Sequence, residues 1–151
     1  MKVGVIGAGT MGQGIAKAFA LVDGYTVALC DIKQEWAEGG KDKIAKGYAK
    51  LVEKGKMTQE TVDAILARIT PGLKEDLCAD CDLIVEAAFE NMEVKKTTFA
   101  ELDKIAKPEC IFASNTGFNF FSIYLVRILI QDQFYFPISF LLTLNRSKPN
   151  P

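Results

Sequence analysis

The chain has 151 residues, of which 49% are apolar and 25% charged, and its formal net charge is −1. These values are typical of one soluble globular domain, and they favour neither a nucleic-acid partner nor an anionic membrane surface. The sequence contains no histidine. This excludes an imidazole base, or a zinc site with histidine ligands, on this chain.

The first residues predict a strand, a glycine-rich turn and a helix. Val3–Ile6 is a short apolar run typical of a buried parallel strand. The turn that follows consists of Gly7, Ala8, Gly9, Thr10, Met11 and Gly12. Gly7 permits the tight turn, Gly9 lets the backbone approach a pyrophosphate, and Gly12 allows the helix to pack closely on the strand. The helix would point N–H groups and a partial positive charge at the phosphates.

The second strand ends in an acidic residue. Ile15, Ala16, Phe19 and Ala20 share one helical face, Gly24 closes that helix, and Thr26–Cys30 is the next apolar run. Asp31 follows, about 20 residues after the turn, where a carboxylate can accept both ribose hydroxyls and repel a 2′-phosphate. The pattern therefore predicts NAD rather than NADP as cofactor. The alternative is a glycine-rich turn without a ligand.

The next segment predicts a helical hairpin inserted between strands. Gln34–Lys56 reads as one long helix, weakened at Gly39-Gly40 and closed by Gly55, and Thr58 can cap a second helix that runs to about Arg68. Insertions of this kind often serve a second substrate. The tip carries a cluster of Lys50, Lys54 and Lys56. Its alternative interpretation is a solvated basic face.

Three further strands complete a parallel sheet. Ile69-Thr70 is a short strand stopped by Pro71-Gly72, Cys81–Ala88 is an apolar strand suited to a sheet covered on both faces, and Ile111–Ala113 is the last. Asn91 can cap the intervening helix, which ends before Pro108 and turns Val94, Phe99, Leu102 and Ile105 inward. The predicted fold class is α/β, a Rossmann-type doubly wound parallel sheet with a helical hairpin insertion.

The four cysteines suggest reduced thiols in a cytoplasmic protein, because their spacing is not that of a secreted scaffold and no signal peptide precedes them. Cys78 and Cys81 form a C-x-x-C pair, but neither a thioredoxin-like context nor a second ligand pair accompanies it. We therefore predict small buried thiols beside a strand, and no metal site.

The composition changes after Gly117. No alanine or glycine occurs beyond it, and Phe, Tyr, Ile and Leu accumulate. Arg127 and the run 131–133 interrupt the apolar stretch too early for a membrane span. We expect either a sheet-edge strand or an aberrant apolar tail over 117–151.

Residues 1–116 resemble the NAD-binding half of 3-hydroxyacyl-CoA dehydrogenases, above all the bacterial 3-hydroxybutyryl-CoA dehydrogenases of butyrate and fatty acid metabolism. The matching stretches are KVGVIGAGTM from Lys2, Gly14–Ala16, Asp31–Lys33, Lys50–Val52, Lys54–Lys56, ADCDLIVE from Ala79, Glu90–Met92, Val94–Lys96 and Ala113–Thr116. The resemblance implies that Ala87, Glu90, Lys95 and Asn115 line the NAD site and that Lys54 contacts the phosphates of an acyl-CoA substrate. A cation at a phosphate is chemically sensible.

The departures from the family pattern concern catalysis. The family continues Ser-Asn-Thr with Ser-Ser-Leu, whereas this chain has Gly117-Phe118, and the family's later His-Phe-Phe-Asn-Pro stretch and paired glutamate do not occur. The resemblance also implies a helical C-terminal domain, with most of the homodimer interface, that this chain lacks. We therefore expect no catalytic residue here, and hypothesise a truncated or frame-shifted gene copy. Three functions remain open: a dehydrogenase with little turnover alone, a non-catalytic NAD-binding module, or another Rossmann protein such as a flavoprotein.

Overall fold

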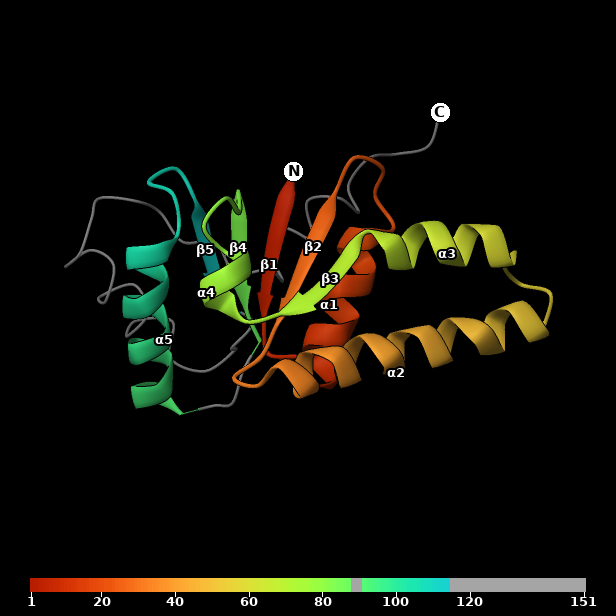
Figure 1. The fold of residues 1–151 in the computed structure, drawn as a ribbon, viewed down its shortest axis with the longest axis horizontal. Coiled ribbons are helices and arrows are strands. Elements are labelled where there is room, and N and C mark those ends of the chain that lie inside the picture. The colour runs from red at the N-terminus through yellow and green to blue at the C-terminus, as the bar shows by residue number, and fades with distance from the viewer. Residues whose placement is uncertain (88–90, 115–151) are drawn as a thin grey trace, which may run out of the picture.

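A computed structural model of the chain describes residues 1–87 and 91–114 (Figure 1). Glu90, Asn115, the predicted domain boundary after residue 116 and the predicted tail lie outside the described residues. The elements in chain order are β1 (Lys2–Ile6), α1 (Thr10–Ala20), β2 (Thr26–Cys30), α2 (Gln34–Glu53), α3 (Gln59–Ala67), β3 (Ile69–Gly72), α4 (Lys74–Leu77), β4 (Leu83–Glu86), α5 (Met92–Ile105) and β5 (Ile111–Ser114).

The five strands form one parallel sheet in the order β3-β2-β1-β4-β5. The chain builds outward from β1 to β3, then crosses to the other side of β1 to place β4 and β5. A switch point of this kind between β1 and β4 is where open α/β sheets bind ligands, beyond the carboxyl ends of the strands. The predicted Rossmann-type fold is confirmed.

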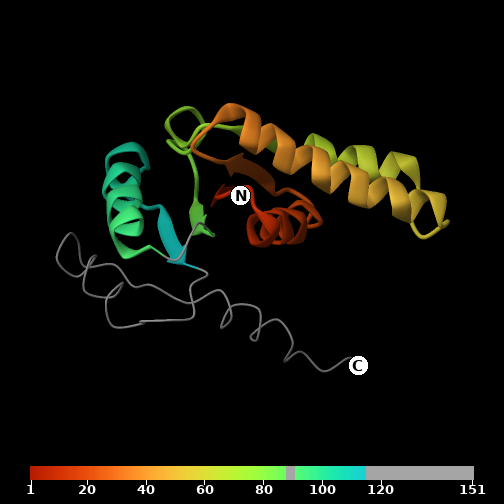
Figure 2. The same cartoon turned by 90° about the horizontal axis from the view of Figure 1, so that it is seen from below.

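Helices cover both faces of the sheet. On one face, α1, α2 and α3 pack on Val3, Val5, Val27 and Leu29. On the other face, α4 and α5 pack on Ile6, Ala28 and Ile84. Alternate residues of each strand therefore enter two different cores, which explains the uninterrupted apolar runs of the sequence. The helices α2 and α3 lie side by side and project beyond the sheet as a hairpin (Figures 1 and 2).

Two strand predictions need correction. β3 does not stop at Pro71 but continues through Gly72. A proline is tolerated there because β3 is the outermost strand in the observed order. Since no further strand pairs with its outer edge, the N–H that proline lacks is not needed for a hydrogen bond on that side. β4 spans only Leu83–Glu86, shorter than the predicted 81–88. The four-residue helix α4 was not expected from the sequence.

The prediction of one long helix after β2 is confirmed, because α2 runs without a break through Gly39 and Gly40. One prediction for the helix α5 was wrong. In α5, Val94 is 47% exposed, whereas Lys95, which the sequence pattern left on the polar side, is 3% exposed. The physical reason is a buried carboxylate on β4, described below, that draws the ammonium inward. Among residues 1–87 and 91–114, no helix has both the length and the apolar character that crossing a bilayer requires.

Candidate functional site: the carboxyl edge of the sheet

One register row brings the predicted cofactor residues to the same edge of the sheet. Cys30, Ile6, Glu86 and Ser114 lie side by side as the last paired residues of four neighbouring strands. The residues that follow three of them are Asp31, Gly7 and Ala87. Main-chain hydrogen bonds continue the row, because Gly7 N donates to Cys30 O at 2.8 Å and Ala87 N donates to Ile6 O at 2.8 Å. The glycine-rich turn and Ala87 thus flank the switch point.

The turn has the geometry that its glycines predict. Gly7 has φ +105°, a conformation that residues with a Cβ rarely adopt. A Cβ on Gly12 would lie 1.7 Å from the Gly7 carbonyl oxygen, so only glycine lets α1 start this close to β1. A Cβ on Gly9 would meet no atom of the described chain within 4 Å. The protein itself therefore does not require glycine at position 9, as expected if a ligand imposes it.

The start of α1 is suited to an anion. The N-cap residue Gly9 supplies no side-chain cap, and the first turn carries no acidic residue. The N–H groups of that turn lack partners within an α-helix and bear partial positive charge. Thr10 and Met11 are solvent-exposed at this end of the helix, with Met11 at 58%. A pyrophosphate oxygen would find main-chain donors here rather than a charged side chain.

Asp31 joins β2 to the turn. Its Oδ2 accepts the Ala8 N–H at 2.8 Å, and its Oδ1 accepts the Ile32 N–H at 2.8 Å. The carboxylate is half-buried. Each carboxylate oxygen accepts more than one hydrogen bond, so both retain capacity for ribose hydroxyls. The same side chain can therefore hold the turn in shape and bind a sugar beside it.

A buried polar cluster behind the edge was missed by the sequence predictions. The Glu86 carboxylate, 0% exposed, accepts hydrogen bonds at Oε2 from Lys95 Nζ at 2.9 Å and from Ser114 Oγ at 2.7 Å. It links β4, α5 and β5 at the height where the strands end. The ammonium of Lys95, implied to line the NAD site, is directed to this carboxylate. A glutamate closing an apolar strand was the available signal, because a buried charge requires a partner.

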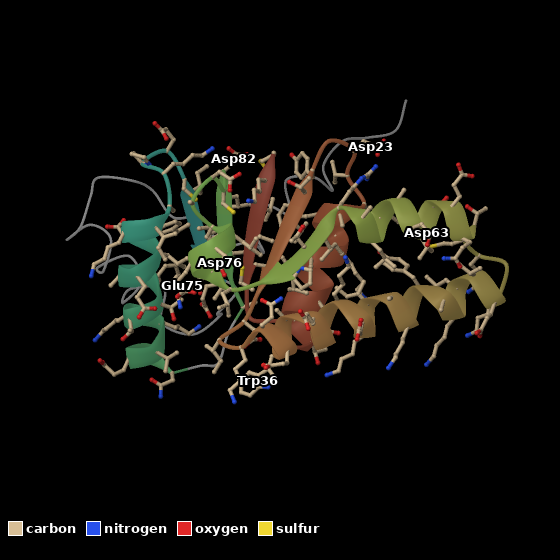
Figure 3. All side chains as sticks on the ribbon, viewed as in Figure 1. Asp23, Trp36, Asp63, Glu75, Asp76 and Asp82 are labelled. Atoms are coloured by element: carbon tan, nitrogen blue, oxygen red, sulfur yellow. The ribbon has the colours of Figure 1, made fainter. Side chains whose placement is uncertain are left out.

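Lys54 is not brought near the edge. It is the C-cap residue of α2, and Lys50, Lys54 and Lys56 are all solvent-exposed at the tip of the hairpin. Asp31 lies just before the other end of α2, so a helix of 20 residues separates them, about 30 Å at 1.5 Å per residue. Figure 3 labels Trp36 near the start of α2 and Asp82 just before β4, on opposite sides of the view.

The cysteines are structural. All four are free and buried, and Cys30 Sγ lies 3.8 Å from Cys78 Sγ. The hydrogen bond to Cys30, together with burial, raises the pKa of Cys78 well above its usual range, and the hydrogen bond to Cys78, together with burial, does the same for Cys81. A Cβ on Gly4 of β1 would lie 3.3 Å from the sulfurs of Cys78 and Cys81, so the thiols fill space against the sheet. The described residues hold no group of three or more side chains able to bind a metal.

The parallel sheet, the glycine turn at its switch point and the acid after β2 define a Rossmann-type dinucleotide-binding domain. Within that class, the sequence profile of the 3-hydroxyacyl-CoA dehydrogenase NAD binding domain matches residues 2–122, and the chain belongs to this family. NAD is thereby confirmed as the cofactor of the family's domain, and the alternative of a flavoprotein is excluded. Which residues hold NAD remains a prediction.

Relatives agree in sequence and in fold. The chain is 49% identical over 119 residues to a probable 3-hydroxybutyryl-CoA dehydrogenase of Deinococcus radiodurans, covering 78% of this chain and 41% of that protein. The crystal structure of (S)-3-hydroxybutyryl-CoA dehydrogenase from Ralstonia eutropha superposes with a TM-score of 0.70 and 39% identity, over 76% of this chain and 40% of that one. The crystal structure of the Escherichia coli 3-hydroxybutyryl-CoA dehydrogenase superposes with a TM-score of 0.72 and 40% identity, and the match covers 77% of this chain and 24% of that one. The chain thus spans less than half of these relatives.

Proposed function

We propose that the chain is the cofactor-binding part of an NAD-dependent 3-hydroxyacyl-CoA dehydrogenase of fatty acid or butyrate metabolism, acting on short acyl chains such as 3-hydroxybutyryl-CoA in the cytoplasm. When bound, NAD accepts the hydride from C3 of the hydroxyacyl group. The observation that carries the proposal is the contact of Asp31 with the glycine turn at the switch point. The names of the relatives support the substrate class, and four buried thiols without a disulfide support a reducing compartment.

Each part of the edge has a proposed role in holding NAD. The main-chain N–H groups from Gly7 to Gly12 bind the pyrophosphate, and Asp31 accepts the hydroxyls of the adenosine ribose. Ala87 lies beyond β4, on the other side of the switch point, where the nicotinamide half would extend. Glu90, Lys95 and Asn115 belong to the same half by resemblance. For Lys95, the bond to Glu86 favours a role in shaping the site over a role as an exposed cation.

The absence of histidine bears on turnover. In the family reaction an imidazole removes the hydroxyl proton while the hydride leaves, and this chain has no histidine. A missing general base costs about a hundredfold to ten-thousandfold in rate. We therefore propose that this chain alone binds NAD and turns over little substrate. A non-catalytic NAD-binding module is the second candidate, favoured by the same observation.

NADH binding to the full chain tests the cofactor proposal. We expect NADH to bind more tightly than NADPH and to raise the melting temperature, because a ligand that binds the folded state stabilises it. Asp31→Ala should weaken NADH binding about tenfold or more, since hydrogen bonds to a charged group are lost, and should narrow the preference over NADPH. Asp42→Ala, an exposed acid on α2, is the matched control. Equal affinities for wild type and Asp31→Ala would contradict the ribose assignment.

A second experiment tests the proposed low turnover and the proposed role of Lys54. Reduction of acetoacetyl-CoA by NADH, followed at the nicotinamide absorbance, should proceed far below an ordinary enzymatic rate. A rate near 10 s⁻¹, roughly the median for enzymes, would refute the proposed inactivity. Lys54→Glu should weaken CoA binding without changing NADH binding, whereas Lys46→Glu, exposed on the same helix, should change neither. Equal CoA affinity for wild type and Lys54→Glu would contradict the phosphate contact.

A further inference from the structure

Gly40 of α2 lies directly against the glycine-rich turn. A Cβ at this position would be 2.7 Å from the Ala8 Cβ and 2.9 Å from the Ala8 carbonyl oxygen. Non-bonded carbon atoms rest about 3.5–4.0 Å apart, so neither distance can be met without movement. Neither atom can rotate away, because one belongs to the backbone and the other is the first atom of a side chain. A single missing methyl group therefore lets α2 touch the turn.

Both partners of this contact are held on their other sides. The Ala8 N–H donates to Asp31 Oδ2 at 2.8 Å, and the Ala8 carbonyl accepts the Gln13 Nε2–H at 2.8 Å. On the helix, Ala37, Ile44 and Tyr48 are 0%, 2% and 6% exposed in the core under α2. A helix anchored by three buried side chains yields less easily than a turn held by hydrogen bonds. An added methyl group should therefore move the turn.

We propose that Gly40 is a positioning residue for the cofactor: through it, α2 sets the placement of Ala8 and of the Ala8–Asp31 hydrogen bond. The amides that would face the pyrophosphate and the carboxylate that would face the ribose both depend on this contact. The inference rests on the proposed NAD site for its ligand, but the contact itself belongs to the protein alone. It also gives the hairpin a role at the turn, in addition to the proposed role of Lys54 at its tip.

Gly40→Ala is the test, with Gly47→Ala as the matched control. Gly47 lies in the same helix, is exposed, and a Cβ there would meet nothing within 4 Å. Both substitutions raise helix propensity equally, so a difference between them reports the packing around Gly40, where an added Cβ would meet Ala8 and, at 3.3 Å, Leu29 Cδ2. We expect Gly40→Ala to weaken NADH binding about tenfold or more, since one misplaced charge-assisted hydrogen bond suffices for that loss. Gly47→Ala should bind NADH as the wild type does.

Solvent exchange of the Ala8 amide provides a readout that needs no cofactor. In Gly40→Ala this amide should exchange about tenfold faster than in the wild type, because its bond to Asp31 is strained, while Gly47→Ala should leave it unchanged. If the wild type fails to bind NADH, the proposed function fails, and the exchange comparison still decides the inference. The inference about Gly40 would be overturned if Gly40→Ala and Gly47→Ala had equal exchange rates at the Ala8 amide, or if both bound NADH with equal affinity.

A double variant guards against misfolding of Gly40→Ala. Ala8→Gly removes the methyl group that lies 2.7 Å from the added Cβ. Added to Gly40→Ala, the Ala8→Gly substitution should restore folding if Gly40→Ala alone fails to fold. It should also recover part of the lost NADH affinity and part of the protection of the residue 8 amide from solvent exchange. A purely structural effect of Gly40 elsewhere in α2 would not respond to a change at Ala8. A double variant no better than Gly40→Ala would therefore count against the proposal.

Discussion

Glu86 holds the carboxyl edge together, and its substitution by glutamine tests that role. A glutamine side chain at this position would retain the size of the glutamate and an oxygen able to accept the Ser114 hydroxyl, so the change removes little beyond the negative charge. The ammonium of Lys95 is 3% exposed and lies 2.9 Å from the carboxylate. The substitution removes the negative charge that this buried ammonium faces.

The expected loss is large compared with the stability of a single domain. Removing one partner of a buried ion pair costs about 3–5 kcal/mol. The free energy of unfolding of a domain is about 5–15 kcal/mol, so Glu86→Gln should lose about a fifth of it or more. Urea unfolding followed by far-UV circular dichroism measures this, with a lower midpoint and an unchanged m-value expected.

An exposed ion pair on the same helix is the control. Glu93 and Lys96 pair at 3.1 Å in α5 with side chains 82% and 49% exposed, so Glu93→Gln should cost less than about 0.5 kcal/mol. Adding Lys95→Met to Glu86→Gln should recover part of the loss, because the buried ammonium that faced the carboxylate is removed as well. The reasoning would be refuted if Glu86→Gln lowered the free energy of unfolding no more than Glu93→Gln does. It would also be refuted if the losses from Glu86→Gln and Lys95→Met simply added in the double variant.

Three other features of the structure give measurable outcomes. Thr58 caps α3 by accepting the Thr61 N–H at 3.2 Å, so Thr58→Ala should lower the unfolding free energy by about 1 kcal/mol in urea titrations and Thr58→Ser should not. Asp82 accepts hydrogen bonds from the Lys107 ammonium and the Lys2 N–H, which lower its pKa below the usual 3.8. Its contribution to stability is therefore present above that value and lost as the pH falls through the lowered pKa, so acid titration of Asp82→Asn should show a weaker pH dependence below about pH 4. The buried thiols should resist iodoacetamide in the folded protein and all react in urea, as mass spectrometry would show.

What the sequence could predict was local. The turn at Gly7 and the caps at Thr58 and Asn91 each depend on a few neighbouring residues, and the structure shows the positive φ and both caps. The fold class also followed, because a glycine-rich turn after the first strand and alternating strands and helices are typical of a doubly wound parallel sheet.

What the sequence could not predict depends on contacts between distant elements. Lys95 looked polar and outward because its partner Glu86 lies on another element. Pro71 looked like a strand end because the position of β3 at the edge of the sheet follows only from the complete order. Gly40 looked like a weakness of α2, since helix propensity counts only the cost of glycine and not the turn that packs against it.

The position of Lys54 constrains how a complete enzyme of this kind could work. α2 has one end beside Asp31 and the other at Lys54, about 30 Å away along a helix of 20 residues. A CoA whose phosphates lie at the hairpin tip must therefore extend its acyl end back along the hairpin to meet a nicotinamide beyond β4. Hydride transfer requires the reacting atoms about 3–3.5 Å apart, so under the proposed contact of Lys54 with CoA the length of the hairpin would limit where C3 can lie. Gly40 fixes the hairpin to the turn near its cofactor end. A substitution there should then disturb the alignment of both substrates, whereas one at Lys54 should disturb CoA alone.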